Sequence, residues 1–318
     1  MYHRIADESR DPWELSVTPE HFEQHLLLLQ EKYPIISVPE LIAQVNNKAV
    51  TSDSVCLSFD DGYADNFHVA KPLLEQYNTP ATFFIPSQNL IEQEPFWWDE
   101  LESIIFDSDH LPTGFSGNIN GQNIEVNLGD EATLTSLLVK KQNGWTWPQN
   151  PPTKRCALYL NLWENLKPME YTRLQAELNK VKGWAGASNL ATPSQLAMTV
   201  HELQAMAAHP LFDIGLHTVT HPALSAHSYA VQKHELDKNR KILEGYCGKP
   251  ISSVAFPYGD YNKTTLDVVR ELNLSAAFCT KEMPVTSKSD LTNLGRFQVK
   301  NWNKNSFENA LDRWFKAS

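Results

Sequence analysis

Two adjacent aspartates, Asp60 and Asp61, directly follow the short apolar run from 55 to 59. Side-by-side carboxylates repel each other and lose solvation when a fold buries them, so a cation or a reacting proton has to offset that cost. An acidic pair before a glycine is also common in ordinary turns. The pair becomes informative only if further metal ligands stand elsewhere in the chain.

Two histidines supply those ligands. His217 and His221 stand four residues apart, after the apolar strand candidate 212–216. This spacing presents both imidazoles to one side of a helical turn, and one added carboxylate gives the three-ligand open site of a catalytic zinc centre. Both sets of residues follow strands, and α/β barrels carry their chemistry at the carboxyl ends of strands.

The same histidine spacing occurs once more, at His21 and His25. This pair lies in an amphipathic helix pattern that Thr18 and Pro19 open, so we interpret it as a solvated helix face. We therefore take His217 and His221 with one of the two aspartates as the ligand set, and we leave the other aspartate free for proton transfer.

The chain resembles a known family, the polysaccharide deacetylases, which form the NodB-homology or carbohydrate esterase family 4 group. Four runs carry the resemblance in the expected order: Phe59 to Tyr63, Thr79 to Ile85, His217 to Pro222 and Phe256 to Gly259. The resemblance implies a distorted (β/α) barrel. It implies a divalent cofactor on Asp61, His217 and His221, with Asp60 as general base. Zinc is our first choice, and similar sites also accept cobalt, nickel or manganese.

Two further roles follow from the resemblance. It assigns the backbone N–H of Tyr258 as a donor to the tetrahedral intermediate, whereas the alternative is an ordinary Pro-Tyr-Gly turn. It also implies an acid that protonates the leaving amine. No histidine follows residue 278, so we assign this role to His3, as in a subset of the family that resembles a circular permutation. The alternative for His3 is a flexible chain terminus.

One departure from the family pattern concerns the arginine that usually holds the base aspartate. This chain has Ala255 at that position. Arg296 and Arg4 are equal candidates to replace it, and either one is alternatively a surface charge.

Four other side chains leave two interpretations open. Tyr63 and Asp65 either line the pocket or cap the next helix. Trp97 and Trp98 could stack on sugar rings, but an aromatic pair is more often part of a core, and we favour the core.

Length and composition exclude several classes of protein. The chain has 318 residues and a formal net charge of −11, which disfavours nucleic acid and anionic membranes as partners. No apolar stretch is long enough to span a bilayer, and the first residues lack a hydrophobic signal region, so we expect a cytoplasmic protein. The four scattered cysteines indicate buried thiols and no disulfide framework.

Strand patterns alternate with helical patterns, which predicts a largely parallel sheet. We expect strands at 55–59, 81–85, 212–216, 252–256, 275–279 and 294–299, and helices that include 69–76, 229–243 and 263–272. The alternation lapses from about 96 to 195, where we expect a hairpin turning at Asn120-Gly121 and helices near 154–166 and 168–181. We interpret residues 1–318 as one deacetylase domain with an inserted subdomain at about 96–195.

The sequence thus predicts a metal-dependent hydrolase that removes N-acetyl groups from the amino sugars of a polysaccharide or its lipid-linked precursor. One alternative is a deformylase on a lipid-linked sugar. A second is a saccharide-binding protein with impaired catalysis, suggested by Ala255 and by the absence of a late histidine.

Overall fold

The computed structural model describes residues 1–50, 53–187 and 195–316. The chain divides into two compact units. The first comprises residues 1–7, 15–93 and 197–318, and the second comprises 8–14 and 94–196. The description of the chain as one domain with an insertion at about 96–195 stays a prediction. Among the helices of the described residues, none combines the length and apolar character needed to cross a bilayer.

A parallel sheet of five strands forms the centre of the first unit. In spatial order it contains β3 (Leu57–Phe59), β4 (Ala81–Ile85), β7 (Phe212–Leu216), β8 (Ser253–Ala255) and β9 (Ala276–Phe278). Apart from Asp213, every residue of these strands is buried. Such continuous burial is typical of parallel strands with both faces covered, and it explains why the strands read as apolar runs in the sequence.

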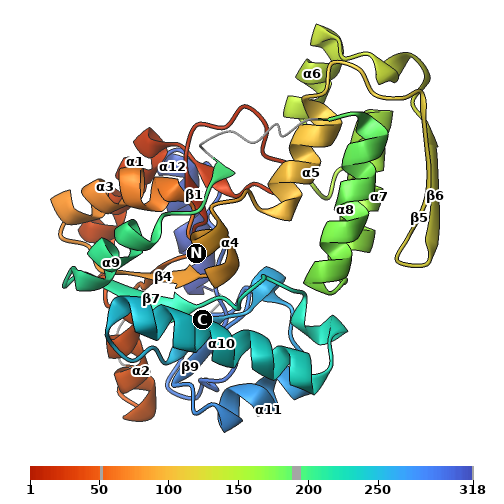
Figure 1. Cartoon of the computed structure of the whole chain (residues 1–318). Helices are drawn as coiled ribbons and strands as arrows, with labels where there is room; N and C mark the ends of the chain where they lie inside the picture. Colours follow the sequence, from red (N-terminus) through yellow and green to blue (C-terminus); the bar gives the residue numbers. More distant parts are fainter. Residues whose placement is uncertain (51–52, 188–194, 317–318) are drawn as a thin grey trace. The chain divides into compact units, whose positions relative to one another are not determined.

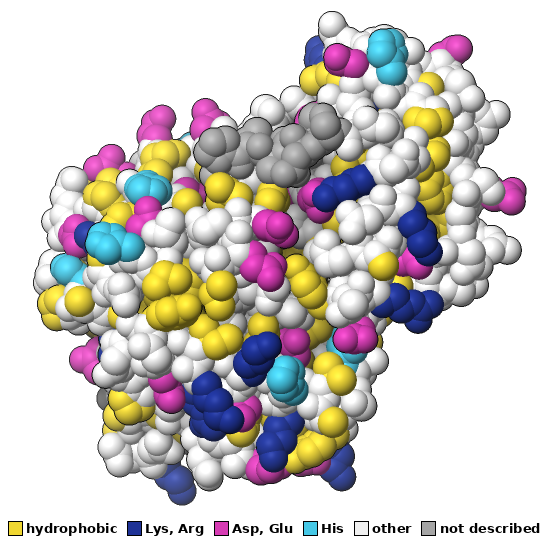
Figure 2. Space-filling view, in the orientation of Figure 1, with side chains coloured by type: hydrophobic (Ala, Val, Ile, Leu, Met, Phe, Trp, Pro, Cys, Tyr) yellow, Lys and Arg dark blue, Asp and Glu magenta, His cyan; other side chains and the backbone are white. Residues whose placement is uncertain are grey.

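Helices connect and cover these strands (Figure 1). They are α1 (Pro19–Lys32), α2 (Val38–Asn46), a π-helical turn (Asn66–Ala70) that runs into α3 (Lys71–Gln76), α4 (Ser87–Glu92), α9 (Val200–Ala208), α10 (Tyr229–Cys247), α11 (Lys263–Glu271) and α12 (Lys304–Lys316). The expected capping box opens α9, where Thr199 and Glu202 bond each other's backbone. Acidic and basic side chains intermingle over α10 and α11 (Figure 2), in pairs such as Arg240 with Asp237.

Two short segments close the sheet into a distorted barrel. Tyr2 pairs with β3, since its N–H donates to Ser58 O at 2.8 Å and its carbonyl accepts from Asp60 N at 3.0 Å. Leu294 pairs with β9 through Cys279 N and Ala277 O, and three residues later Phe297 O accepts from the Met1 amine. Residues 294–299 therefore run from one sheet edge to the segment that covers the other. The next residues, β1 (Arg4–Ile5), pair in parallel with β2 (Ser16–Val17).

This closure corrects one expectation from the sequence. Residues 294–299 do not form a strand; the segment makes an isolated bridge at Leu294 only. The physical reason is that it changes partner within a few residues, from β9 to the N-terminal segment, so no regular ladder can form. The other five expected strands are confirmed, with ends that differ by up to two residues.

The second unit is built from helices and one hairpin. Its elements are α5 (Trp97–Phe106), β5 (Gly114–Ile119), β6 (Gln122–Asn127), α6 (Ser136–Asn143), α7 (Lys154–Leu166) and α8 (Tyr171–Ala185). The predicted hairpin is confirmed: β5 and β6 are antiparallel, and Asn120 and Gly121 both have positive φ, as a tight two-residue turn requires. Trp97 and Trp98 are 4% and 6% exposed, which confirms the core interpretation.

A second correction concerns α1. His21 lies near the surface, but His25 is fully buried, with its ring 4.0 Å from that of Phe307 on α12. Its Nε2 donates to Trp302 O at 2.6 Å, which leaves Nδ1 to accept from the Tyr2 hydroxyl at 3.3 Å. Helical periodicity places His25 on the same face as Phe22 and Leu29, so this half of the pair belongs to the core.

The cysteines follow their prediction in part. All four are free thiols. Cys156 and Cys279 are buried, whereas Cys56 and Cys247 are half-buried.

Candidate metal centre

The sequence-predicted ligands converge at the carboxyl ends of neighbouring strands. Asp61 follows β3, while His217 and His221 follow β7. Asp61 Oδ1 lies 3.3 Å from His217 Nε2 and 3.2 Å from His221 Nε2, and the two Nε2 atoms are 3.2 Å apart. Three donor atoms therefore form a nearly equilateral triangle, and all three residues are buried.

This triangle fits a tetrahedral cation. Ligand atoms bound at about 2.0–2.1 Å in tetrahedral geometry lie about 3.3–3.4 Å from one another, close to the three observed distances. Within the described residues, this is the one cluster of three His, Cys, Asp or Glu side chains arranged to hold a metal. A neutral imidazole pair and a carboxylate also suit borderline divalent metals.

The ring of His217 is fixed for this role by its other nitrogen. Nδ1 donates to Ala255 O at 2.8 Å, which assigns the proton to Nδ1 and points the lone pair of Nε2 at Asp61 and His221. Burial lowers the pKa of His217, but the carboxylates of Asp61 and Asp60 outweigh it and raise the pKa overall. The field that favours a proton at this point equally favours a metal cation.

The electrostatic environment of Asp61 agrees with a role as a metal ligand. Burial alone would raise the pKa of its carboxyl, but the adjacent imidazoles of His217 and His221 hold the pKa well below its usual range. For His221 burial wins, and the pKa of its imidazole is lowered despite the nearby Asp61. The neutral imidazole, which is the form that binds metals, is favoured there.

Asp60 has a different partner from Asp61. Arg296 grips it in a bidentate pair, with Nη1 to Oδ1 and Nη2 to Oδ2 both at 2.7 Å. Both side chains are at most 6% exposed. Burial would raise the pKa of Asp60, but the Arg296 guanidinium, helped by His217, lowers it overall. The carboxylate is thus held ionised and fixed in orientation.

Arg296 is therefore the replacement for the arginine missing at Ala255, and Arg4 is not. Arg4 Nε pairs with Asp65 Oδ2 at 3.1 Å, and its guanidinium lies 4.6 Å above the ring of Tyr63. Asp65 makes no side-chain cap to the helix that follows it. It accepts instead from Ile5 N at 2.9 Å, which ties the N-terminal segment to the loop after β3.

His3 lies within this electrostatic environment. Burial lowers the pKa of its ring, while the Asp61 and Asp60 carboxylates oppose the shift. Its Nδ1 is buried and has no hydrogen-bond partner among the described residues. Asn66 Nδ2 donates to His3 O at 2.8 Å, so the backbone of His3 is fixed while its ring nitrogen is uncommitted.

Backbone strain concentrates at the same place. Asp61, Thr218, His221 and Tyr258 all have φ between 57° and 69°, a left-handed conformation that side chains other than glycine rarely adopt. A branched residue such as Thr218 is the clearest outlier. Such strain persists where surrounding structure enforces it, and it clusters at functional sites.

Tyr258 lies in the turn after β8. Its ring packs edge-on against His221 with centroids 4.5 Å apart. The turn needs glycine at position 259, because φ is +65° and an added Cβ would lie 2.0 Å from Thr280 Oγ1. The turn that the resemblance assigns to oxyanion stabilisation is therefore next to the ligand triangle and rigid.

Two supporting residues were missed in the sequence. Glu235 accepts from Val219 N and Thr220 N at 2.8 and 2.9 Å, and Asn239 accepts from His217 N at 3.1 Å. Both are buried on α10. Their spacing of four on an otherwise amphipathic helix was the available signal, because two polar residues on the face toward the sheet need partners there.

A family model described as "Polysaccharide deacetylase" matches residues 47–110 and 170–277, and the chain belongs to this family. The match includes Asp60, Asp61, His217, His221 and Tyr258. His3 and Arg296 lie outside it.

Individual relatives agree with this assignment. The chain is 30% identical over 92 residues to YxkH of Bacillus subtilis (strain 168), which is named as a polysaccharide deacetylase; the match covers 28% of this chain and 32% of YxkH. In structure it is similar to the deacetylase PplD of Streptococcus pyogenes in complex with acetate, with a TM-score of 0.54, 20% identity, and coverage of 97% and 95%. IcaB from Ammonifex degensii gives a TM-score of 0.57 at 15% identity, with coverage of 98% and 94%. These structural likenesses establish the fold, a distorted (β/α) barrel.

Proposed function

We propose that this protein is a metal-dependent hydrolase that removes N-acetyl groups from the amino sugars of a polysaccharide or its lipid-linked precursor. The observation that carries the proposal is the triangle of Asp61, His217 and His221 beside an aspartate fixed by Arg296. A purely structural acidic cluster would not require two inward-facing imidazoles with their nitrogens 3.2 Å apart.

Different residues of the chain carry out different steps of the hydrolysis. When bound, a divalent cation supplies Lewis acidity that acidifies water and polarises an amide carbonyl. Asp60, ionised and oriented by Arg296, accepts the proton of the attacking water. His3 donates a proton to the leaving amine. The backbone N–H of Tyr258 stabilises the developing oxyanion.

The two observations that suggested a saccharide-binding protein with impaired catalysis have another explanation. That alternative arose because Ala255 replaces an arginine and no late histidine exists. Arg296 supports the first function from another segment, and His3 is available for the second. Nothing specific favours a deformylase, and assaying both acetate and formate as products distinguishes the two reactions.

The test combines turnover with metal content. Wild type should release acetate from N-acetylglucosamine oligomers or lipid-linked precursors, contain about one bound divalent ion per chain, and lose activity on chelation. Asp60→Asn should keep the ion and lose about 10² to 10⁴ in kcat, the usual contribution of a general base. Asp213→Asn, a half-buried aspartate in β7, is the matched control and should retain activity.

Two results would contradict the proposal. One is an undiminished rate in Asp60→Asn. The other is a wild-type protein that binds these saccharides with its metal in place but releases no product.

A further inference from the structure

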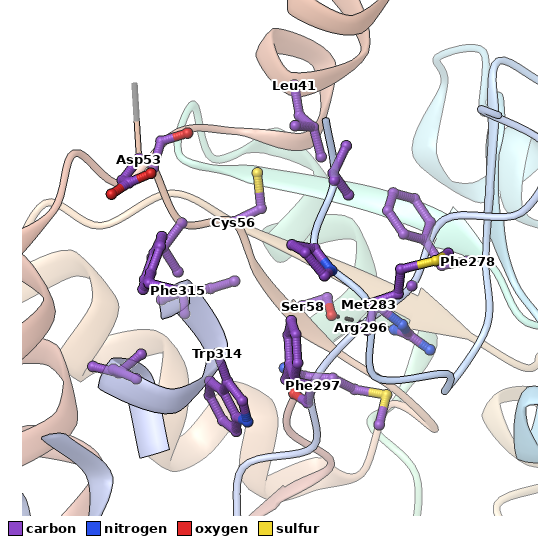
Figure 3. Close-up of a pocket in the computed structure, with 18 of the residues that line it drawn as sticks. Leu41, Asp53, Cys56, Ser58, Phe278, Met283, Arg296, Phe297, Trp314 and Phe315 are labelled. Atoms are coloured by element: carbon purple, nitrogen blue, oxygen red, sulfur yellow. Dashed lines mark hydrogen bonds between the residues drawn. The ribbon is translucent and has the colours of Figure 1, made fainter. Parts of the chain in front are cut away.

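A cavity lies in the first unit, behind the proposed catalytic base. Its volume is about 440 Å³, within the range that small-molecule sites occupy. Ser58 and Arg296 line it, and Arg296 is the residue that grips Asp60. Figure 3 shows these two side chains, joined by a hydrogen bond, at one end of the cavity and Asp53 at the other.

The walls of the cavity are mostly apolar. They come from the two N-terminal residues, α1, α2, Val50, residues 55–58, Phe278 of β9, residues 283–285 and 295–299, and α12. Several lining side chains, including Val55, Met283, Trp314 and Phe315, are only half-buried. Leaving such a concentration of apolar surface in contact with water costs about 25 cal/mol per Å². Contiguous exposed apolar surface of this kind commonly marks a binding site.

The polar atoms of Arg296 and Ser58 at the inner end of the cavity already have hydrogen-bond partners within the protein. Arg296 Nε donates to Cys279 O at 3.2 Å, Nη1 donates to Ser58 Oγ and Asp60, and Nη2 donates to Asp60. A sugar would bury its hydroxyls there without partners, at a cost of about 1–3 kcal/mol each. A hydrocarbon chain needs no hydrogen-bond partners and does not incur this cost.

The rim is polar and carries one acidic side chain. Asp53 is exposed, and Ser54, Thr286 and Ser287 are further polar residues of the lining. No lysine lines the cavity among the described residues, its one arginine is already paired with Asp60, and the amine of Met1, which also lines it, donates to Phe297 O at 2.9 Å. A positively charged head group at the rim would therefore meet an attractive carboxylate, and a negative one would be repelled.

We propose that this cavity binds the hydrocarbon chain of a cationic amphiphile, with the chain against the apolar walls and an ammonium head group beside Asp53. Each CH₂ buried from water contributes about 0.8 kcal/mol, which is about a fourfold gain in affinity. The exposed charge pair at Asp53 adds only about 0.2–1 kcal/mol, a factor of roughly 1.4–5.

The experiment measures the binding of n-alkylammonium ions of increasing length below their micellar concentrations, by calorimetry and by the change in tryptophan fluorescence. Affinity should rise about fourfold per CH₂ and then level off when the chain fills the cavity. At equal length the ammonium should bind more tightly than the alcohol, and the alcohol more tightly than the carboxylate. Asp53→Asn should remove the preference for the ammonium and keep the dependence on chain length.

Substitution within the cavity supplies the control. Val55→Phe should fill part of the cavity and shorten the longest chain that still gains affinity. Leu266→Phe, at a half-buried apolar residue of α11 outside the cavity, should bind as wild type does. Affinity independent of chain length, or Val55→Phe binding like wild type, would overturn the proposal. Binding is measured without turnover, so the proposed deacetylation can fail while this site stands.

Discussion

The pairing of Arg296 with Asp60 gives the sharpest test of the reasoning about the site. Two unit charges about 4 Å apart interact by about 4 kcal/mol at the effective dielectric of about 20 that suits protein interiors. Removing one partner of a buried pair leaves the other charge uncompensated and typically costs 3–5 kcal/mol. Both side chains are nearly inaccessible here. We therefore expect Arg296→Met to lower the free energy of unfolding by about 3–5 kcal/mol.

The assay is a double-mutant cycle with Asp60→Asn, read by urea unfolding at neutral pH. Each single variant leaves one buried group without its partner, whereas the double variant leaves no unpaired charge. The double variant should therefore be less destabilised than the sum of the single variants, by about 2–4 kcal/mol. Arg296→Lys retains the charge but loses the fork of two parallel bonds, and it should recover only part of the stability.

Activity supplies a second readout of the same pair. If Arg296 orients the base, Arg296→Met should reduce kcat by about 10² while leaving the metal bound. Arg270→Met is the control, since Arg270 and its partner Asp267 are each about half exposed, and it should change stability by less than about 0.5 kcal/mol. Effects of the two single variants that add within about 0.5 kcal/mol would refute the coupling.

Three further predictions concern other parts of the chain. Burial lowers the pKa of His25 to about 4, so between pH 6.5 and 4 the unfolded state binds more protons than the folded state. The free energy of unfolding should therefore fall on acidification, by up to about 3 kcal/mol. His25→Gln should remove this loss and His21→Gln should not, which acid titrations of stability will test. Arg155 donates to four backbone carbonyls and forms no ion pair within the part of the chain that the structure describes. Arg155→Met should therefore destabilise the second unit by more than about 4 kcal/mol in hydrogen exchange, and a cost under 1 kcal/mol would count against this role. In Glu235→Gln, one of the two carboxylate oxygens that bond the segment between His217 and His221 becomes an amide nitrogen. Metal titration should then show affinity about 10- to 100-fold weaker, and unchanged affinity would contradict this role.

Much of the barrel was readable because its strands are buried on both faces. Short, mainly apolar runs predicted β4 and β7 residue for residue, and helix periodicity did the same for α7. Turn chemistry at Asn120-Gly121 predicted the hairpin, because both residues tolerate positive φ. These are local signals, and local signals are what a single sequence carries most directly.

The features that were wrong or left open depend on contacts between distant segments. Arg4 and Arg296 looked equivalent because neither position shows which carboxylate lies opposite in the closed barrel. His25 was misread because its partners, Tyr2 and Trp302, come from the two ends of the chain. The strand expected at 294–299 has the right composition, but its partners change along its length.

The second unit is assembled from two pieces of chain that are far apart in sequence. Residues 8–14 belong to it, and there the ring of Trp13 lies 4.2 Å from that of Trp163 while Arg10 pairs with Glu102. A fragment covering 94–196 alone would expose that tryptophan face and leave Glu102 without its arginine. The unit therefore cannot be transferred to another protein as one continuous segment. A transferred unit would have to include residues 8–14 as a second inserted segment, or a linker that joins 8–14 covalently to 94–196.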